Sequence, residues 1–460
     1  MDGDKTAVKG HSGSGAGTPK ALLSLPDGIF LLVGMVIGAG IFRLPSLVAG
    51  NTSSVTEYIL AWVLGGVVSL CGALVYAELA SRIPETGGEY AFLNRGMGRC
   101  VSFVFAWSRM TVIQTGAIAA VAFIFGDYAS EILRLGANSS AIWAAVCVVA
   151  LTALNLAGTL PSKNLQKIME VLLIAALVML GLVGLFSGTE PAASPAVSGG
   201  GNFGLAMVFV LFTYGGWNEA AYIAGEVRDA RRNMVRILVV GIVAVTILYL
   251  LVNLGYLAAL GLAGIRDSKA VAVDVMRLVA GDGGVILVAL IVCVSAFTTI
   301  NAALFTGART NWALGRDFPL FARLGIWRDA GSTPANALLL QGVVTLALVA
   351  AASVTPDGFG AMVAYTAPVF WTFFLLTGLT LFIIRGRDRA KPSFSVPLYP
   401  LTPIVFCGMC AYMLYSSIDY IRNPIFGPKF GDMVLMGIVV MLLGIPLYFL
   451  ARGRAAQASR

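Results

Sequence analysis

The sequence predicts an all-α polytopic membrane protein with twelve transmembrane helices. Of the 460 residues, 58% are hydrophobic and only 12% are charged, whereas about 25% of the residues of a typical soluble domain are charged. Apolar runs of about 20 residues, the length that crosses roughly 30 Å of hydrocarbon, recur along the whole chain. Two of these runs contain glycines near their middles, and these glycines predict that both helices are discontinuous.

The apolar runs also predict the orientation of the chain. The expected spans cover residues 22–50, 56–81, 101–129, 140–157, 164–187, 203–226, 236–263, 283–308, 336–354, 360–384, 398–420 and 432–452. An even number of spans places both termini on one side, and that side carries 23 of the 31 Lys and Arg residues. Positive charge gathers in cytoplasmic loops, so we expect the cytoplasmic (inner) membrane with both termini in the cytoplasm. The Lys and Arg residues of these loops account for the formal net charge of +8, so the charge does not imply a nucleic acid partner.

The residue types that enzymes and metal sites use are scarce. The single histidine, His11, lies in a polar N-terminal stretch, which excludes a histidine-based catalytic site or zinc site. Cys407 and Cys410 form a CxxC pair, but they lie inside an apolar span, where buried cysteines usually pack as small apolar groups. The protein is therefore not expected to be an enzyme, and no catalytic residue, metal or cofactor is predicted.

The first interrupted run reads VGMVIGAGIF, residues 33–42, and contains three glycines. Each glycine costs about 1 kcal/mol of helix stability relative to alanine. The second reads VFVLFTYGGWNEAAYIAGEV, residues 208–227, with Gly215 and Gly216 near its middle. Glycine also permits close helix packing in membranes, and this role would explain either run alone. The matched positions of the two interruptions favour a binding site.

The two interruptions fall in helices 1 and 6, which enter the membrane from opposite sides. Interrupted helices at corresponding places in two oppositely oriented halves indicate an inverted-repeat transporter. We therefore expect a disordered cytoplasmic tail at 1–20 and a first five-helix repeat at 21–187. A second, inverted five-helix repeat is expected at 203–385, and helices 11 and 12 with a short cytoplasmic tail at 386–460.

An interruption frees backbone N–H and C=O groups, and each costs several kcal/mol if it faces lipid. The freed N–H groups suit a carboxylate, because they carry partial positive charge. The freed carbonyls suit an ammonium group or a cation, and glycine lets a ligand approach the backbone closely. A small zwitterion that carries both groups on one carbon fits such a site.

Several motifs resemble those of the amino acid–polyamine–organocation transporter superfamily. VIGAGIF resembles its GSGIF-type motif, and residues 60–93 are similar to the signature of its bacterial amino acid permeases and L-type amino acid transporters. LFTYGGWNEA followed by EVRDARRNM, then TINAALFTGAR and SVPLYPLTPI, also match in order and spacing. The likeness runs from about residue 25 to past residue 404.

This resemblance implies a twelve-helix fold that works by alternating access, and it implies site residues by position. The substrate carboxylate would lie on backbone N–H groups at Ala39, Gly40 and Ile41. The substrate amine would meet carbonyls near Val36, Phe212, Thr213 and Gly215. Phe212 matches an aromatic outer gate and Trp217 flanks the same interruption, although both could be ordinary core aromatics.

The coupling of transport to an ion is left open between three alternatives. Several sodium-independent members of the superfamily carry a lysine in the middle of helix 5, where this chain has Leu173, with Glu170 one turn earlier. The hydroxyls of Thr298 and Thr299 could join helix 1 carbonyls around a sodium ion, or bond only their own backbone. Proton coupling through Glu170 or Glu219 and plain exchange are the other two alternatives.

Charged residues inside spans need partners or water. Arg109 and Glu170 lie at similar depth, which allows an ion pair between them, either as a gate or as a structural tie. Arg43 lies just outward of the helix 1 interruption. It could steer anionic substrates, close an outer gate, or be an ion-paired residue without a further role.

The sequence thus predicts a secondary transporter of zwitterionic amino acids that works by uptake or exchange. The expected partners are the amino acid and the lipid bilayer, and the oligomeric state is left open. One alternative is a polyamine or amine exchanger, which would need pocket carboxylates, and only Glu219 is a candidate. Another is a non-transporting amino acid sensor, against which the short tails argue.

Overall fold

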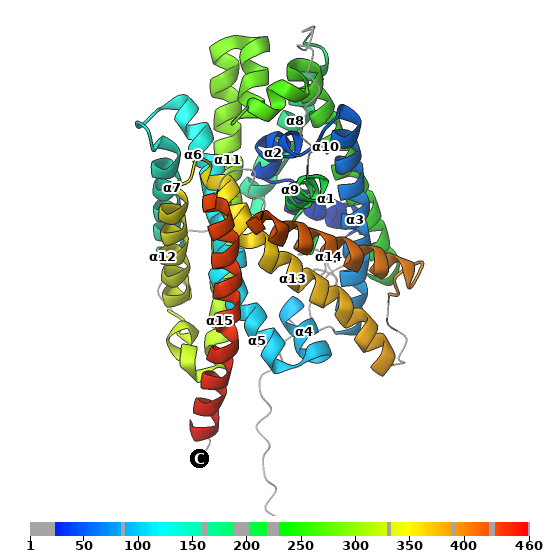
Figure 1. Ribbon diagram of the computed structural model, residues 1–460, viewed down its shortest axis with the longest axis vertical. Helices are drawn as coiled ribbons and strands as arrows, with labels where there is room; N and C mark the ends of the chain where they lie inside the picture. The colour runs from blue at the N-terminus through cyan, green and yellow to red at the C-terminus, as the bar shows by residue number, and fades with distance from the viewer. Residues whose placement is uncertain are drawn as a thin grey trace, which may run out of the picture.

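The computed structural model describes residues 24–83, 88–158, 163–187, 202–218, 230–328, 333–388, 392, 394–422 and 428–458 (Figure 1). Within these ranges the regular structure is helical, apart from one isolated bridge between Arg328 and Thr333. Helix α1 (Leu25–Val36) begins at a capping box, in which Ser24 and Asp27 exchange bonds with each other's backbone. Such a box satisfies backbone donors that the first helical turn leaves unpaired.

Ten segments of the described chain are long and apolar enough to cross a membrane, which makes this a multi-pass membrane protein. They are α3 (Val55–Arg82), α5 with η2 and α6 (Arg99–Ile132), α7 (Ser139–Leu156), α8 (Lys163–Leu185), α10 (Ala230–Asp267), α11 (Val271–Asp317), α12 (Ala335–Ala352), α13 (Gly358–Arg387), α14 (Leu401–Arg422) and α15 (Pro428–Ala458). Two further apolar helices are shorter: α1 and α9 (Phe203–Thr213). These two begin the spans for which the sequence predicts an interruption.

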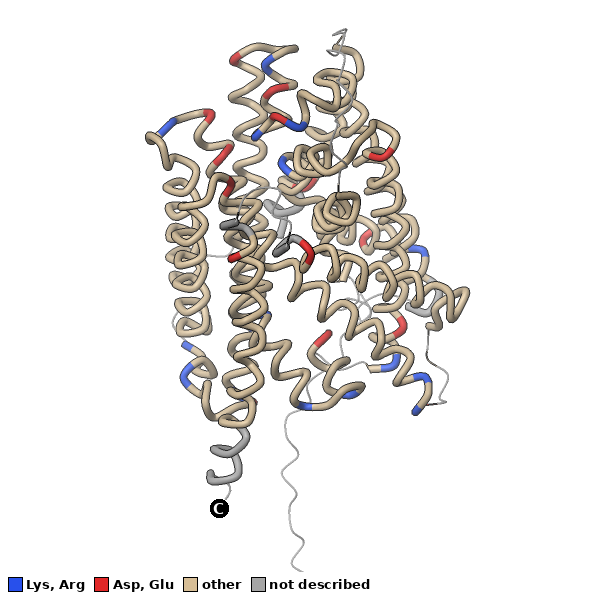
Figure 2. The backbone as a smooth tube through the Cα atoms, in the orientation of Figure 1, with Lys and Arg blue, Asp and Glu red and all other residues tan. Residues whose placement is uncertain are grey.

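The distribution of side chains fits a lipid environment. Many of the described Lys and Arg residues lie toward the two ends of the helix bundle, and long stretches of the helices between them carry no charge (Figure 2). Large apolar side chains on several helices are more than half exposed, among them Leu172 on α8, Ile247 on α10 and Val343 on α12. A soluble monomer rarely exposes such continuous apolar surface, whereas lipid tails cover it without cost.

The short helices lie at the centre of the bundle (Figure 1). Helix α1 packs against α10, while α2 (Leu44–Gly50) packs against both α9 and α10. The turn η1 (Ala39–Phe42) between α1 and α2 contacts α6, α9 and α11. The longer helices therefore surround both interrupted segments and shield their backbone groups from lipid.

Three structured segments lie where the sequence predicts loops or continuous helix. Helix α4 (Glu89–Met97) is set between two glycines of positive φ, Gly88 and Gly98. Helix α11 begins twelve residues before the predicted span, and its first part turns at Gly281 (φ 60°). The third, η2 (Arg109–Ile113), is a π-helical turn between α5 (Arg99–Ser108) and α6 (Gln114–Ile132). Such turns add a residue to a helix and are frequent at functional sites.

Candidate functional site

The first interruption follows the glycines of the motif at 33–42. Helix α1 ends at Val36, and Ile37 and Gly38 are extended, with Gly38 at φ −122° and ψ −170°. A short 3₁₀ turn at η1 then leads into α2. The last carbonyls of α1 and the first N–H groups of η1 have no partners inside a continuous helix, so they are available to other groups.

The second interruption follows α9. That helix ends at Thr213, and the chain turns through Tyr214 and Gly215 to Gly216, whose φ is 110°. Positive φ of this kind is readily adopted only by glycine. Trp217 and Asn218 complete the described part of this segment, and the predicted residue Glu219 lies outside the described residues.

The two interruptions meet in space, although nearly 180 residues separate them in the chain. A Cβ atom on Gly216 would lie 2.1 Å from the carbonyl oxygen of Met35. This distance is too short for any residue that has a side chain. A Cβ atom on Gly40 would lie 3.7 Å from the Cα atom of Thr213. Glycine at residue 216 therefore permits the backbones of the two segments to approach each other closely, whereas the contact at Gly40 is an ordinary van der Waals contact.

One residue that the sequence analysis does not single out joins both interruptions. The hydroxyl of Tyr249, on α10, lies 3.1 Å from the carbonyl oxygen of Val36 and 3.1 Å from that of Thr213. Both carbonyls belong to the set predicted to meet the substrate amine. The structure thus brings these two main-chain groups to one hydroxyl.

The predicted aromatic residues differ in their surroundings. Phe212 is half-buried at the end of α9, and its carbonyl accepts a bond from the N–H of Gly215. Trp217 is buried in an aromatic cluster, with ring centroids 5.2 Å from Tyr76, 5.4 Å from Phe374 and 5.9 Å from Phe406. Its indole therefore packs against α3, α13 and α14.

The predicted coupling residues lie on α8 and α11. Thr298 and Thr299 each donate to the carbonyl of Ser295 at 2.9 Å. This bonding to their own helix backbone is the predicted alternative to a cation site. Thr299 nevertheless faces the first interruption, because its hydroxyl lies 4.0 Å from the Cβ position of Gly38. The carboxyl group of Glu170 occupies the space that a side chain at Gly34 would need, so it lies against α1.

The possible ion pair between Arg109 and Glu170 is not found among the ion pairs of the described residues. Arg109 instead pairs with Glu89, at 3.3 Å between Nη1 and Oε2. The other carboxylate oxygen of Glu89 accepts from Asn218, beside the second interruption, at 3.2 Å. Glu89 begins α4, a helix that the sequence analysis assigns to a loop, so the partner of Arg109 could not be recognised there.

Arg43 is buried and ion-paired. Its Nη2 lies 3.0 Å from Oδ2 of Asp357, and its Nε lies 3.8 Å from Oδ2 of Asp127. Its Nη1 donates to the hydroxyl of Ser46 at 2.6 Å and reaches the carbonyl of Ser268 at 3.5 Å. Because Asp127 lies in the last part of α6 and Asp357 precedes α13, the guanidinium ties the start of α2 to two of the long helices.

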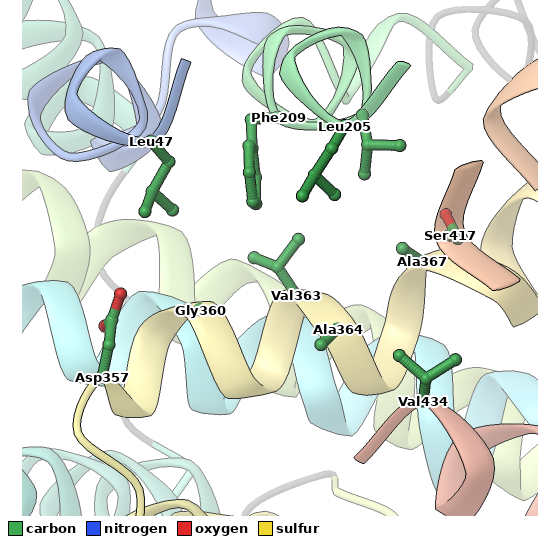
Figure 3. A pocket seen from close by; sticks show the side chains of 11 residues that line it. Leu47, Leu205, Phe209, Asp357, Gly360, Val363, Ala364, Ala367, Ser417 and Val434 are labelled. Carbon is green, nitrogen blue, oxygen red and sulfur yellow. The ribbon is translucent and has the colours of Figure 1, made fainter. Parts of the chain in front are cut away.

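A small pocket lies next to these segments, between α2 and α9 on one side and α13 on the other (Figure 3). Apolar side chains line most of it, including Leu47, Phe209 and Val363, and Asp357 lies at one end. None of the predicted site residues lines this pocket. It therefore lies between the first part of α9 and α13 and is distinct from the meeting point of the two interruptions.

The comparisons with known proteins agree with this architecture. Residues 23–444 match the amino acid permease family, so the chain belongs to that family. The b(0,+)-type amino acid transporter 1 of Mus musculus is 28% identical over 441 residues, which cover 93% of this chain and 87% of the relative. The serine/threonine exchanger SteT of Bacillus subtilis is 26% identical, with coverage of 95% and 98%. The large neutral amino acids transporter small subunit 2 of Homo sapiens is 28% identical, with coverage of 98% and 83%.

Proposed function

We propose that this protein is a secondary transporter that moves zwitterionic amino acids across the cytoplasmic membrane by alternating access, as uptake or as exchange. The observation that carries this proposal is the meeting of two interrupted helices, where the carbonyls of Val36 and Thr213 converge on one hydroxyl. The full-length relatives named as amino acid transporters or exchangers support the same substrate class.

In this proposal the main chain holds both charges of the substrate. The N–H groups of Ala39, Gly40 and Ile41, freed by the first interruption, receive the carboxylate. The carbonyls of Val36, Phe212, Thr213 and Gly215 receive the ammonium group. The support is the local geometry: η1 directly follows the extended residue Gly38, and Gly40 lies against Thr213. Phe212 and Trp217 are proposed as the gate or pocket residues of this site.

The proposed fold is twelve transmembrane helices in two inverted repeats of five, followed by helices 11 and 12. Both termini lie in the cytoplasm, because most Lys and Arg residues fall on that side. Ten described segments of membrane-spanning length and the two short helices α1 and α9 support this count. In this arrangement, α1 and α9 begin corresponding helices of the two proposed repeats.

Three coupling modes are compatible with the residues at the site. Sodium would lie near the hydroxyls of Thr298 and Thr299, of which Thr299 faces the first interruption. A proton would be carried by Glu170, which lies against α1, or by Glu219. Exchange of one amino acid for another needs neither.

The first prediction concerns flux itself. Purified protein in proteoliposomes should take up radiolabelled neutral amino acids in a saturable manner, or exchange them for amino acid loaded inside. Uptake should be measured with a sodium gradient and a pH gradient imposed separately, so that each coupling mode gives a distinct result. Exchange alone would show flux only in loaded vesicles, and protein-free liposomes are the control.

Two other outcomes would contradict the proposal. Saturable amino acid binding without uptake or exchange would favour the sensor. Flux of polyamines that neutral amino acids do not inhibit would favour the amine exchanger. That alternative requires carboxylates at the substrate, whereas the contact between the ends of α1 and α9 consists of two main-chain carbonyls and one tyrosine hydroxyl.

A further inference from the structure

The chain turns back at the end of α11. This helix ends at Asp317, and a short 3₁₀ segment, η4 (Pro319–Gly325), leads toward α12. The ring of Phe318 lies 4.7 Å from the ring of Phe103 on α5, and the side chain of Leu324 is buried. Because η4 also contacts α11, α12 and α15, the turn is held against one end of the bundle, below α12 in Figure 1.

Aromatic and basic side chains alternate along one face of the last turns of α11. Steps of three or four residues, which keep side chains on one helical face, separate Phe305, Arg309, Trp312 and Arg316. The guanidinium carbon of Arg309 lies 3.2 Å from the ring centroid of Phe305, and that of Arg316 lies 5.0 Å from the ring centroid of Trp312. Trp327, which follows η4, packs on Trp312 at 5.3 Å and lies 5.8 Å from the guanidinium of Arg309. Two stacked arginines therefore flank a pair of tryptophans.

The positive charge of this turn is not balanced by ion pairs. Four arginines form none with any described residue: Arg309, Arg316, Arg323 and Arg328. The acidic residue between them, Asp317, accepts from the hydroxyl of Tyr90 at 3.4 Å, and Asp329 lies outside the described residues. Arg309 donates from Nη1 to the carbonyl of Phe305 at 3.0 Å. Since a guanidinium has five N–H donors, donors remain for an anion that comes from outside the protein.

Apolar surface lies exposed beside these arginines. The side chain of Ile326 is 56% exposed, and Trp327 is partly exposed. Tryptophan favours the boundary between lipid and water, and the planar guanidinium of arginine matches the oxygens of a phosphate group. A phospholipid with net negative charge offers both a phosphate and apolar chains. Free phosphate would satisfy the arginines but leave Ile326 in water.

We propose that the surface formed by Arg309, Trp312, Arg316, Ile326 and Trp327 binds an anionic phospholipid in the leaflet at this end of the bundle. The headgroup lies over the two tryptophans, and its phosphate accepts hydrogen bonds from the arginines that flank them. The first carbons of the acyl chains cover Ile326 and Trp327. The bound lipid attaches the turn between α11 and α12 to the membrane. This inference goes beyond the proposed function and does not depend on transport.

The test measures lipid binding to the full chain in detergent by native mass spectrometry. Phosphatidylglycerol, which is anionic, and phosphatidylcholine, which is zwitterionic, are added separately at equal concentrations. Wild-type protein should retain phosphatidylglycerol at lower concentrations than phosphatidylcholine. Arg309→Gln combined with Arg316→Gln should weaken binding of phosphatidylglycerol about thirtyfold, because each arginine near an anionic lipid contributes about fivefold. Binding of phosphatidylcholine should not change.

Arg134→Gln combined with Arg277→Gln is the matched control, because it removes the same charge at the opposite end of the bundle. Arg277 lies in the first turns of α11, whereas Arg316 lies in its last turn. Arg134 follows α6 and is exposed, and Arg277 pairs with Glu131 near the end of the same helix. The affinity of this control for phosphatidylglycerol should equal that of the wild type.

Three results would overturn the inference. Wild-type protein without a preference for phosphatidylglycerol would show that the turn does not recognise anionic lipid. Equal losses in the two double variants would show attraction by net charge alone. Displacement of phosphatidylglycerol by excess inorganic phosphate would show a site for small anions. If the double variant does not fold, Arg316→Gln alone changes one exposed side chain. It should weaken binding about fivefold, and an unchanged affinity there would also contradict the inference.

Discussion

Replacement of Gly40 by leucine should abolish amino acid uptake and leave a folded protein. A Cβ atom at this position would lie 3.1 Å from the side chain of Leu44 and 3.7 Å from the Cα atom of Thr213. The three further carbons of leucine would then fill the space in front of the N–H groups at residues 39–41. Uptake into proteoliposomes gives the activity, and size-exclusion chromatography in detergent shows whether the variant is folded.

Gly40→Ala is the matched control for this variant. Its single added carbon meets only the flexible end of Leu44 closely, and the backbone there is not in the left-handed region. Uptake should stay within about fivefold of wild type, because one methyl group changes such a site by about 1 kcal/mol. If Gly40→Leu transports with an unchanged KM, the substrate carboxylate is not bound at this turn.

The second large effect is expected on stability, from Glu78→Ala. The carboxylate of Glu78 is completely buried and accepts from Arg82 at 2.8 Å, from the Nε of Arg385 at 2.8 Å and from the N–H of Val396 at 2.7 Å. These bonds tie α3 to the end of α13 and to the segment that precedes α14. Removal of one partner from a buried ion pair costs about 3–5 kcal/mol, because the remaining charges lose their compensation. The thermal unfolding midpoint in detergent should fall by many degrees.

Glu131→Ala provides the comparison for Glu78→Ala. Glu131 also pairs with an arginine, Arg277, at 2.8 Å, but the two side chains are 35% and 50% exposed. Exposed pairs contribute about 0–1 kcal/mol, so the unfolding midpoint should hardly change. Equal shifts in the two variants would show that the Glu78 cluster contributes no more to stability than a surface pair does.

Local composition made the interruptions predictable from the sequence. Glycines at residues 34, 38 and 40 and at residues 215 and 216 weaken two apolar helices just where α1 and α9 end. The same argument fails for α4, because its nine residues are too polar to form a span and too short to show a clear helical period. The helix between Val271 and Gly281 is mostly apolar, but it is too short to cross a membrane and was therefore not predicted.

The contacts between distant residues could not be read from the sequence. Tyr249 looks like any aromatic residue of an apolar helix, because nothing nearby in the chain shows that it reaches Val36 and Thr213. Depth alone allowed a pair between Glu170 and Arg109, but depth does not fix which way a helix faces. The rotation of each helix about its axis is set by packing against several neighbours at once.

The position of Trp217 has a practical consequence. Its indole is enclosed by the rings of Tyr76, Phe374 and Phe406, and it is joined to Gly216 by a single peptide bond. Any rearrangement of the backbone at residue 216 therefore shifts this indole relative to the three rings. Fluorescence emission of the chain, once the other six tryptophans are replaced by phenylalanine, would report the arrival of a solute in real time without an attached dye.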